Sequence, residues 1–420
     1  MSVGRRTLTL LILLGLVGTP ALLMRALCVG HSCDAPAKAA GSAPFCRLPP
    51  EIRRGLIDGY QQGRSPDVFA VARTEGALKV GDGRWPGIDA RVGGLPVVMP
   101  AVVDPPDRPR LDQIAPTVAA LIGLERAHPE VRSGKAMPLR SAPGGDRPRV
   151  VLLVGLKGWD DLEAAPPALQ AVVDAGRAWE VSPGSIPADP AALFTTVGTG
   201  GVPRQHGITG SVIRDADGVA RSSWRPGAPT SVIATLADDL DELSGQEATV
   251  AMVAHAPTDR GLIGNGWYVD TDRDAFVVQP HPGRAGRAFE RIVKEGDQSA
   301  LYALSLDLDE GMRRVNAAVA RALRVVERVS GGDMLTVVVG TGERPEPVMD
   351  ERELIARLGE AADLIERTVA GGFFLDQKAL ARTGTSEDAL VEALKAIEVD
   401  GRRLFADVFT GISLAFGRYC

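Results

Sequence analysis

The sequence predicts an α/β protein with a mainly parallel sheet, helices on both faces of that sheet, and a transmembrane helix before it. Three observations lead to this fold class. The 420 residues are 45% hydrophobic and 24% charged, which suffices for a large core. After residue 149, short aliphatic runs alternate with amphipathic segments, the rhythm of strand, crossover and strand. Near the N-terminus, residues 7–27 form an almost unbroken apolar run.

The expected strands are short apolar runs bounded by glycine and proline, a pattern typical of strands buried on both faces. The segment at 371–375 is either a strand or part of a hairpin. The full set is 68–73, 95–103, 150–156, 248–254, 275–278, 300–306, 335–339, 371–375 and a last strand near 412–416.

The expected helices have apolar residues at helical spacing and recognisable ends. One of them stops near Gly123, and Thr385 or Ser386 caps the last one. The full set is 50–60, 111–124, 162–175, 191–197, 232–243, 288–294, 310–329, 351–361 and 387–397.

The chain divides into a membrane anchor or signal segment at 1–28, a cysteine-bearing linker at 29–66 and an α/β domain at 67–420. Residues 34–66 are rich in Ala, Gly, Pro and Arg, so no core element is expected there. A second linker of similar composition at 133–149 separates 67–134 from 149–420.

The N-terminal run is about long enough to span a bilayer as a helix of roughly 20 residues. Arg5 and Arg6 precede it, and an acidic chain with cysteines follows, which places the body outside the cytoplasm. We therefore predict a single-pass membrane protein with an extracytoplasmic body. The alternative is secretion after signal cleavage near Thr19-Pro20-Ala21.

Four cysteines occur, three clustered after the apolar run and one as the last residue. In an oxidising compartment they suggest two disulfides with three possible connectivities. Three clustered cysteines cannot all pair among themselves. We therefore expect Cys420 to pair with Cys28, Cys33 or Cys46.

Charge and composition exclude some functions. The net charge is −6, and the sequence has no dense basic run, so no nucleic-acid partner is expected. The whole chain has five histidines and four cysteines, which leaves few ligands for a multinuclear metal centre.

Four segments carry a family resemblance. Residues 149–158, followed by Pro187-Ala-Asp-Pro-Ala-Ala-Leu-Phe-Thr-Thr-Val-Gly-Thr-Gly and Val202-Pro-Arg-Gln-His-Gly-Ile-Thr-Gly, resemble the nucleotide pyrophosphatase and phosphodiesterase branch of the alkaline phosphatase superfamily. Residues 95–134 look like the segment near the C-terminal end of such enzymes. Because that segment comes first here, the resemblance suggests a circular permutation or a fusion of fragments, and it implies an alkaline-phosphatase-like sheet.

The residues that would carry the family's two-metal chemistry are replaced. Lys157 stands where the family has its first metal-binding Asp, and Pro190 stands where it has the nucleophilic Thr. Asp189-Pro190 is instead typical of a helix start. The strand at 335–339 runs into Gly340-Thr341-Gly342 rather than Asp-His-Gly, and only Asp307 and Asp309 follow the strand at 300–306.

The histidines do not restore a metal site, because no two of them have ligand spacing. His206 matches a position that is structural in the family, and His281, His31 and His128 lie in loop or linker surroundings. His255 follows a strand, close to where such a sheet exposes ligands.

Other motifs have plainer explanations. The glycine-rich segments at 198–201 and 340–342 are predicted to be tight turns. Asp160 and Asp161 fit a solvated helix start. Asp270, Asp272 and Asp274 lack the glycine and closing glutamate of a calcium loop.

We therefore expect a membrane-anchored, phosphatase-like protein without a competent metal site or cofactor, acting as a binding or envelope scaffold. No catalytic, metal or cofactor residue is assigned, and the protein or anionic partner is unidentified. The alternative is a hydrolase of phosphate or sulfate esters that uses Thr195 or Thr196, with Lys157 stabilising charge and Asp189 or His255 supporting it. In either case Lys157, Asp189, Thr195 and Gly340 should converge at the carboxyl edge of the sheet, with Lys157 beside an acidic or carbonyl partner.

Overall fold

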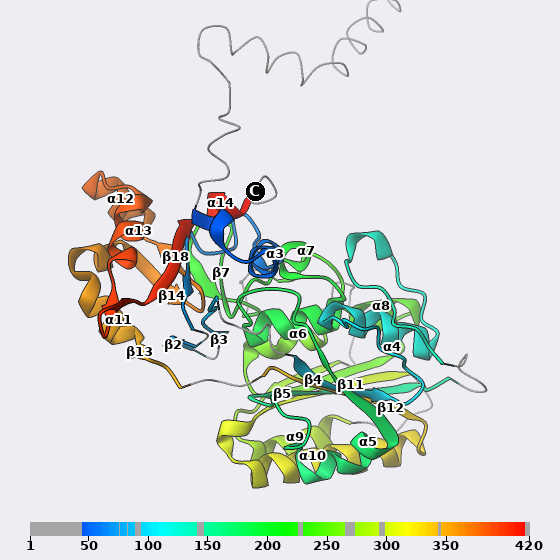
Figure 1. Ribbon diagram of the computed structural model, residues 1–420. Coiled ribbons are helices and arrows are strands. Elements are labelled where there is room, and N and C mark those ends of the chain that lie inside the picture. The colour runs from blue at the N-terminus through cyan, green and yellow to red at the C-terminus, as the bar shows by residue number, and fades with distance from the viewer. Residues whose placement is uncertain are drawn as a thin grey trace, which may run out of the picture.

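A seven-stranded sheet forms the centre of the larger of two lobes (Figure 1). The structure is a computed structural model that describes residues 44–74, 76–81, 83–88, 94–140, 147–225, 230–264, 274–293, 299–342 and 346–415. The first five strands across the sheet are parallel, and β4 runs antiparallel to both of its neighbours. The mainly parallel α/β class is thus confirmed. In spatial order the strands are β10 (Ala275–Val278), β9 (Thr249–Ala254), β11 (Ala300–Asp307), β5 (Val150–Lys157), β12 (Met334–Gly340), β4 (Leu95–Pro100) and β6 (Gly176–Val181).

Helices cover both faces of this sheet, as predicted (Figure 1). Along β5, Val151 and Leu153 belong to one hydrophobic cluster and Leu152 and Val154 to the other. Because successive side chains of a strand point to opposite faces, a strand covered on both sides has to be apolar throughout. The first face is covered by α4 (Ile114–Ile122), α6 (Pro190–Thr199), α8 (Leu236–Leu243) and the 3-10 helix η6 (Pro257–Leu262), the second by α5 (Gln170–Ala175), α9 (Pro282–Ile292) and α10 (Met312–Ser330).

The smaller lobe is built on a four-stranded sheet in which β1 is central. The strands in spatial order are β14 (Ile365–Val369), β15 (Gly372–Leu375), β1 (Val68–Ala72) and β18 (Phe405–Thr410). Its main helices are α11 (Glu351–Leu358), α12 (Gln377–Thr383) and α13 (Glu387–Lys395) on one side, and η2 (Pro44–Arg47), α3 (Pro50–Gly59) and α14 (Gly411–Ala415) on the other. Short elements complete the fold: β2 (Leu78–Val80), β3 (Gly83–Arg84), α7 (Pro203–His206), β7 (Val212–Arg214), β8 (Ala220–Ser222), β13 (Met349–Asp350), β16 (Glu398–Val399) and β17 (Arg402–Arg403).

The first described residues belong to a core, which corrects the expectation that none lies within 34–66. Phe45, Ile52 and Leu56 are buried with Phe409 and Leu414 in one cluster. The rings of Phe45 and Phe409 meet edge to face, with centroids 5.2 Å apart. The two ends of the described chain therefore lie together.

Several helices and strands begin or end at other residues than predicted. The helix expected at 162–175 is shorter, with a 3-10 turn at Pro167–Leu169 before α5. The one expected from 232 begins at 236, because Thr235 caps α8 by accepting from the Asp238 amide. The last strand, expected near 412–416, is β18 at 405–410, and residues 411–415 are helical.

The two lobes form one folded unit, and residues 133–140 are not a free linker. The Gly134 amide donates to the Gly200 carbonyl at 2.9 Å, and Met137 is buried. Ile213 of β7 packs with Ala191 of α6 in the larger lobe, and the next residue, Arg214, forms ion pairs with Asp67 and, at 3.3 Å, with Glu366 of the smaller lobe.

Within the described ranges, no helix is long and apolar enough to cross a membrane. The predicted span at 7–27 lies outside them.

Candidate functional site at the carboxyl edge of the sheet

The carboxyl ends of the parallel strands meet at one edge of the large sheet, where α/β folds commonly bind ligands. Lys157 ends β5, and its register partner Asp307 ends β11. Gly340 ends β12 and pairs with Leu156. His255 follows the last residue of β9. This edge therefore brings together the strand-end residues that the sequence singled out.

Lys157 forms a buried ion pair with Asp259. Its Nζ lies 2.9 Å from Asp259 Oδ1, and the two side chains are 1% and 0% exposed. The other carboxylate oxygen accepts from the Ser305 hydroxyl at 2.7 Å and from the Ala256 amide at 3.0 Å. The expected acidic partner of Lys157 is confirmed.

Two glycines bring Asp259 into place by letting η6 pack closely on α6. A Cβ at Gly261 would lie 2.2 Å from Thr195 Oγ1, and a Cβ at Gly198 would lie 2.1 Å from the Gly261 carbonyl oxygen. Side chains larger than hydrogen would clash at these distances, so both glycines are needed for the close approach. The sequence shows a buried lysine in need of an anion, but nothing in it selects Asp259 among the acidic residues.

His255 lies beside the strand end of β11 and is mostly covered. Its Nδ1 is 3.0 Å from the Pro280 carbonyl, which can only accept, so Nδ1 carries the proton. Its Nε2 is 3.7 Å from Asp307 Oδ2. The Asp307 carboxylate also accepts from the Asp309 amide at 3.0 Å. This arrangement orients the imidazole without gathering ligands around one point.

The residues present do not fit the two-metal centre that the family resemblance implies. Metal ligands of that kind are carboxylates and imidazoles held around a common centre. Here an ammonium group occupies the end of β5, and the carboxylate nearest to it already neutralises that charge. Within the described residues, no group of three His, Cys, Asp or Glu side chains is placed to hold a metal ion.

The start of α6 contacts β3 and the segment before β7. Asp189 caps the helix through the Ala191 amide at 2.8 Å, as predicted, and accepts from the Ser211 hydroxyl at 2.8 Å. Its Oδ2 would lie 3.2 Å from a Cβ at Gly83 of β3. The predicted convergence holds for Lys157 and Gly340, whose strands pair up to their last residues. Asp189 lies beside β3, and a Cβ at Gly342 would lie 3.1 Å from Cζ of Arg84 in the same strand.

Thr195 and Thr196 are both fully buried. The Thr195 hydroxyl donates to the Ala191 carbonyl at 2.7 Å, and Thr196 Oγ1 lies 3.1 Å from His206 Nε2. Hydroxyls used inside the helix and its neighbour are not presented to a substrate, so the geometry does not favour either as a nucleophile.

His206 has the structural role that the resemblance implies. Its Nδ1 accepts from the Ile208 amide at 3.1 Å, so the ring holds the turn after α7. Burial, with a further contribution from Arg64, lowers the pKa of His206 to about 3. The ring is therefore neutral at physiological pH.

The glycine-rich segments differ from the predicted tight turns: Gly198 and Thr199 belong to α6, and Gly340 is the last residue of β12. A Cβ at Gly340 would lie 2.3 Å from the Trp159 carbonyl oxygen, and the Gly158 amide donates to Thr341 Oγ1 at 3.1 Å. Asp160 and Asp161 are exposed in the loop that follows rather than at a helix start. Asp270 and Asp272 lie outside the described residues.

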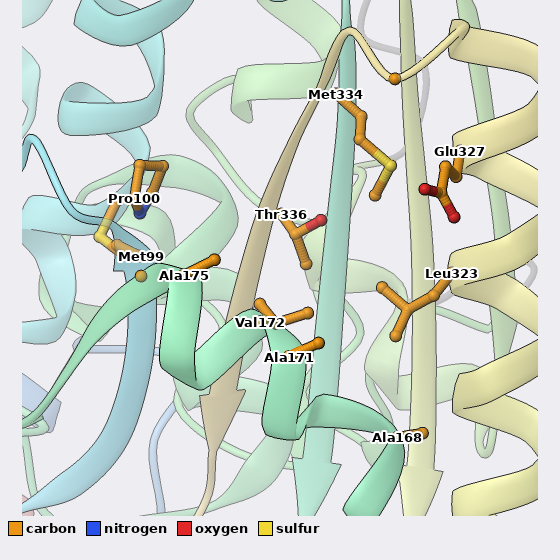
Figure 2. Close-up of a pocket in the computed structure, with 12 residues that line it drawn as sticks. Met99, Pro100, Ala168, Ala171, Val172, Ala175, Leu323, Glu327, Met334 and Thr336 are labelled. Atoms are coloured by element: carbon orange, nitrogen blue, oxygen red, sulfur yellow. The ribbon is translucent and has the colours of Figure 1, made fainter.

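A pocket lies away from the carboxyl edge, next to the amino end of β12 (Figure 2). It has a volume of about 350 Å³ and is lined mainly by apolar side chains of α5, α10 and β12, among them Val172, Leu323 and Met334. Thr336 and the exposed Glu327 supply its polar side chains. Figure 2 shows both reaching toward it from β12 and α10. Sequence patterns gave no sign of this pocket.

No family model, curated protein or solved structure matches the chain.

Proposed function

We propose that this chain is a phosphatase-like protein of the alkaline phosphatase type whose edge site has become a structural ion pair, and that it serves as a binding or scaffold protein outside the cytoplasm. One observation carries the proposal: Lys157 Nζ lies 2.9 Å from Asp259 Oδ1 in full burial. A fixed ammonium group repels divalent cations and satisfies the carboxylate that would otherwise attract them. Support for the family comes from the motifs at 149–158, 187–200 and 202–210 and from the parallel sheet.

The experiment uses the full chain, purified in a non-ionic detergent without chelator. Metal content is measured by mass spectrometry, and turnover of a chromogenic phosphodiester is followed with Zn²⁺, Mn²⁺ and Ca²⁺. We expect substoichiometric metal and turnover equal to that of the buffer. His255→Ala is the matched variant, because His255 is at the edge and lies outside the buried pair.

Turnover that disappears in both Lys157→Ala and His255→Ala would overturn the scaffold proposal and favour the hydrolase. Loss in Lys157→Ala alone would do so only if circular dichroism shows that this variant is folded. The His255→Ala variant thus separates lost chemistry from lost structure.

The proposed location rests on Arg5, Arg6 and the apolar run at 7–27. Protease added to intact cells with a permeable envelope should degrade the chain after about residue 28, a boundary set by the span length. Protection until the membrane is lysed would contradict an extracytoplasmic body. Sequencing of the mature N-terminus distinguishes an uncleaved anchor from a secreted form.

A further inference from the structure

The outer surface of α9 and α10 is strongly basic. The two helices together carry eight arginines and two glutamates, a net charge of +6 in a chain whose overall net charge is −6. We call this surface the arginine face. Its arginines are Arg284, Arg287, Arg291, Arg313, Arg314, Arg321, Arg324 and Arg328.

The spacing of these arginines places them in stripes. On α9 they recur at positions i, i+3 and i+7, which is one helix face. On α10, Arg314, Arg321 and Arg328 recur every seven residues. At a rise of about 1.5 Å per residue, this second stripe extends over about 21 Å.

The two helices lie side by side, so the stripes form one surface. A Cβ at Gly286 of α9 would lie 3.1 Å from the Ala318 Cα and 3.3 Å from Arg321 Cδ of α10. Arg321 also pairs with Glu290 across the helices at 2.7 Å. Within the described residues, the other seven arginines have no ion pair with a carboxylate. Their charge is therefore available to a partner.

The chemistry of this surface fits a phosphate-bearing polymer. Guanidinium groups bind phosphate oxygens through two parallel hydrogen bonds, and a row of them suits a linear polyanion. Protein interfaces have apolar centres, whereas Met312 is the one large exposed hydrophobic residue recorded on these helices.

The position of the surface argues against a membrane as the partner. The apolar faces of α9 and α10 are buried on the sheet, with Phe289 and Val319 fully covered, so they cannot insert into lipid. The arginine face also lies at the opposite end of the molecule from α3, near which the described chain begins (Figure 1).

We propose that the arginine face binds a linear phosphate-bearing polymer; its assignment to the cell envelope rests on the proposed location outside the cytoplasm. This proposal concerns a surface away from the strand-end site and does not depend on the loss of a metal centre there. The polymer would lie along the α10 stripe and contact several arginines at once.

The test measures binding of fluorescently labelled inorganic polyphosphate to the full chain in non-ionic detergent, as a function of salt. The test variant combines Arg287→Gln of α9 with Arg314→Gln and Arg328→Gln of the α10 stripe, all exposed. The control variant combines Arg352→Gln, Arg402→Gln and Arg403→Gln, which are exposed on the smaller lobe and remove the same charge. Glutamine keeps helix propensity close to that of arginine.

We expect the test variant to bind at least about tenfold more weakly at low salt, since three contacts between guanidinium groups and phosphates are lost. The slope of log affinity against log salt should fall by about 2, since each lost phosphate contact removes about 0.7. The control variant should stay within about twofold of the native protein, as general charge loss alone is screened over a Debye length of about 10 Å.

Equal losses in both variants would overturn the proposal, because they would mean that total charge rather than this surface governs binding. Tighter binding to vesicles of anionic phospholipid than to polyphosphate, at equal phosphate concentration, would contradict the polymer and indicate a membrane as the partner of the arginine face. Tighter binding to poly-glutamate would contradict the assignment of phosphate.

Discussion

Removing one partner of the Lys157–Asp259 pair should destabilise the protein far more than removing both. In Lys157→Met, the Asp259 carboxylate stays buried without its cation. At 2.9 Å and an effective dielectric constant of about 20, the lost attraction is about 6 kcal/mol. Protonation of the carboxylate and its remaining hydrogen bonds offset part of this, so we expect a loss of about 3–5 kcal/mol in the free energy of unfolding.

The double variant Lys157→Met/Asp259→Asn tests the reasoning. The side-chain amide that this variant carries at position 259 keeps one oxygen, which can still accept from Ser305 and Ala256 as the carboxylate does. No buried charge remains. We therefore expect this variant to lie within about 2 kcal/mol of the native protein, since replacing a buried pair as a unit is often close to neutral.

The assay is guanidinium unfolding of the full chain, followed by both tryptophan fluorescence and far-ultraviolet circular dichroism. Coincidence of the two transitions is required before a single free energy is assigned. Arg140→Met is the control: its pair with Asp104 spans 3.2 Å, but the side chains are 56% and 51% exposed, so it should cost less than about 1 kcal/mol. Asp259→Asn alone completes the set. If Lys157→Met is as stable as the native protein, or if the losses of Lys157→Met and Asp259→Asn add up to the loss of the double variant, the pair does not hold the edge together.

Three further predictions concern pH and covalent structure. The pKa of His206 falls from 6.5 to about 3 on folding, so between these values the unfolded chain binds a proton that the folded chain does not. The free energy of unfolding should therefore fall as pH drops from about 6.5 towards 3. In His206→Gln, the free energy of unfolding should depend less on pH over this range. Burial raises the pKa of Asp407 from 3.8 to about 6, so ionisation of this carboxyl destabilises the fold increasingly as pH rises through that window. After a discount for its partial exposure, Asp407→Asn should raise the free energy of unfolding by about 1–2 kcal/mol at pH 7.5 and leave it unchanged at pH 3.5. Cys46 lies in η2 beside β18, so we predict that peptide mapping without reductant recovers Cys46 joined to Cys420. A free thiol at Cys420 in protein purified without reductant would contradict this.

Strand positions in the large lobe were predictable because burial on both faces leaves a continuous aliphatic signature. The runs at 150–156 and 335–339 became β5 and β12 with shifts of one residue. Strand β6 was not predicted, because it is an edge strand whose residues are mostly half-exposed. Its sequence, Gly-Arg-Ala-Trp-Glu-Val, has no apolar run to detect.

Of the contacts at the edge site, the sequence predicted only that Lys157 has an acidic or carbonyl partner. A lysine at the end of a buried strand requires an anion, and this much followed from the sequence. Asp259 could not be chosen, because its approach depends on Gly198 and Gly261 in two separate segments. The arginine face shows the same limit, since its residues lie on two helices and form no dense run along the chain.

Because Phe45 packs on Phe409, the smaller lobe can fold only after its C-terminal residues have been synthesised. Phe409 lies 364 residues after Phe45, which corresponds to roughly 20–70 s of chain elongation. Strand β1 likewise waits for β15 and β18, both near the C-terminus. The smaller lobe therefore cannot close until almost the whole chain has emerged, whereas β5, β9, β11 and β12 of the larger lobe lie within residues 150–340 and can pair earlier. The apolar residues of η2, α3 and β1 therefore stay without their C-terminal partners for that whole interval, and any factor that protects the nascent chain has to cover them.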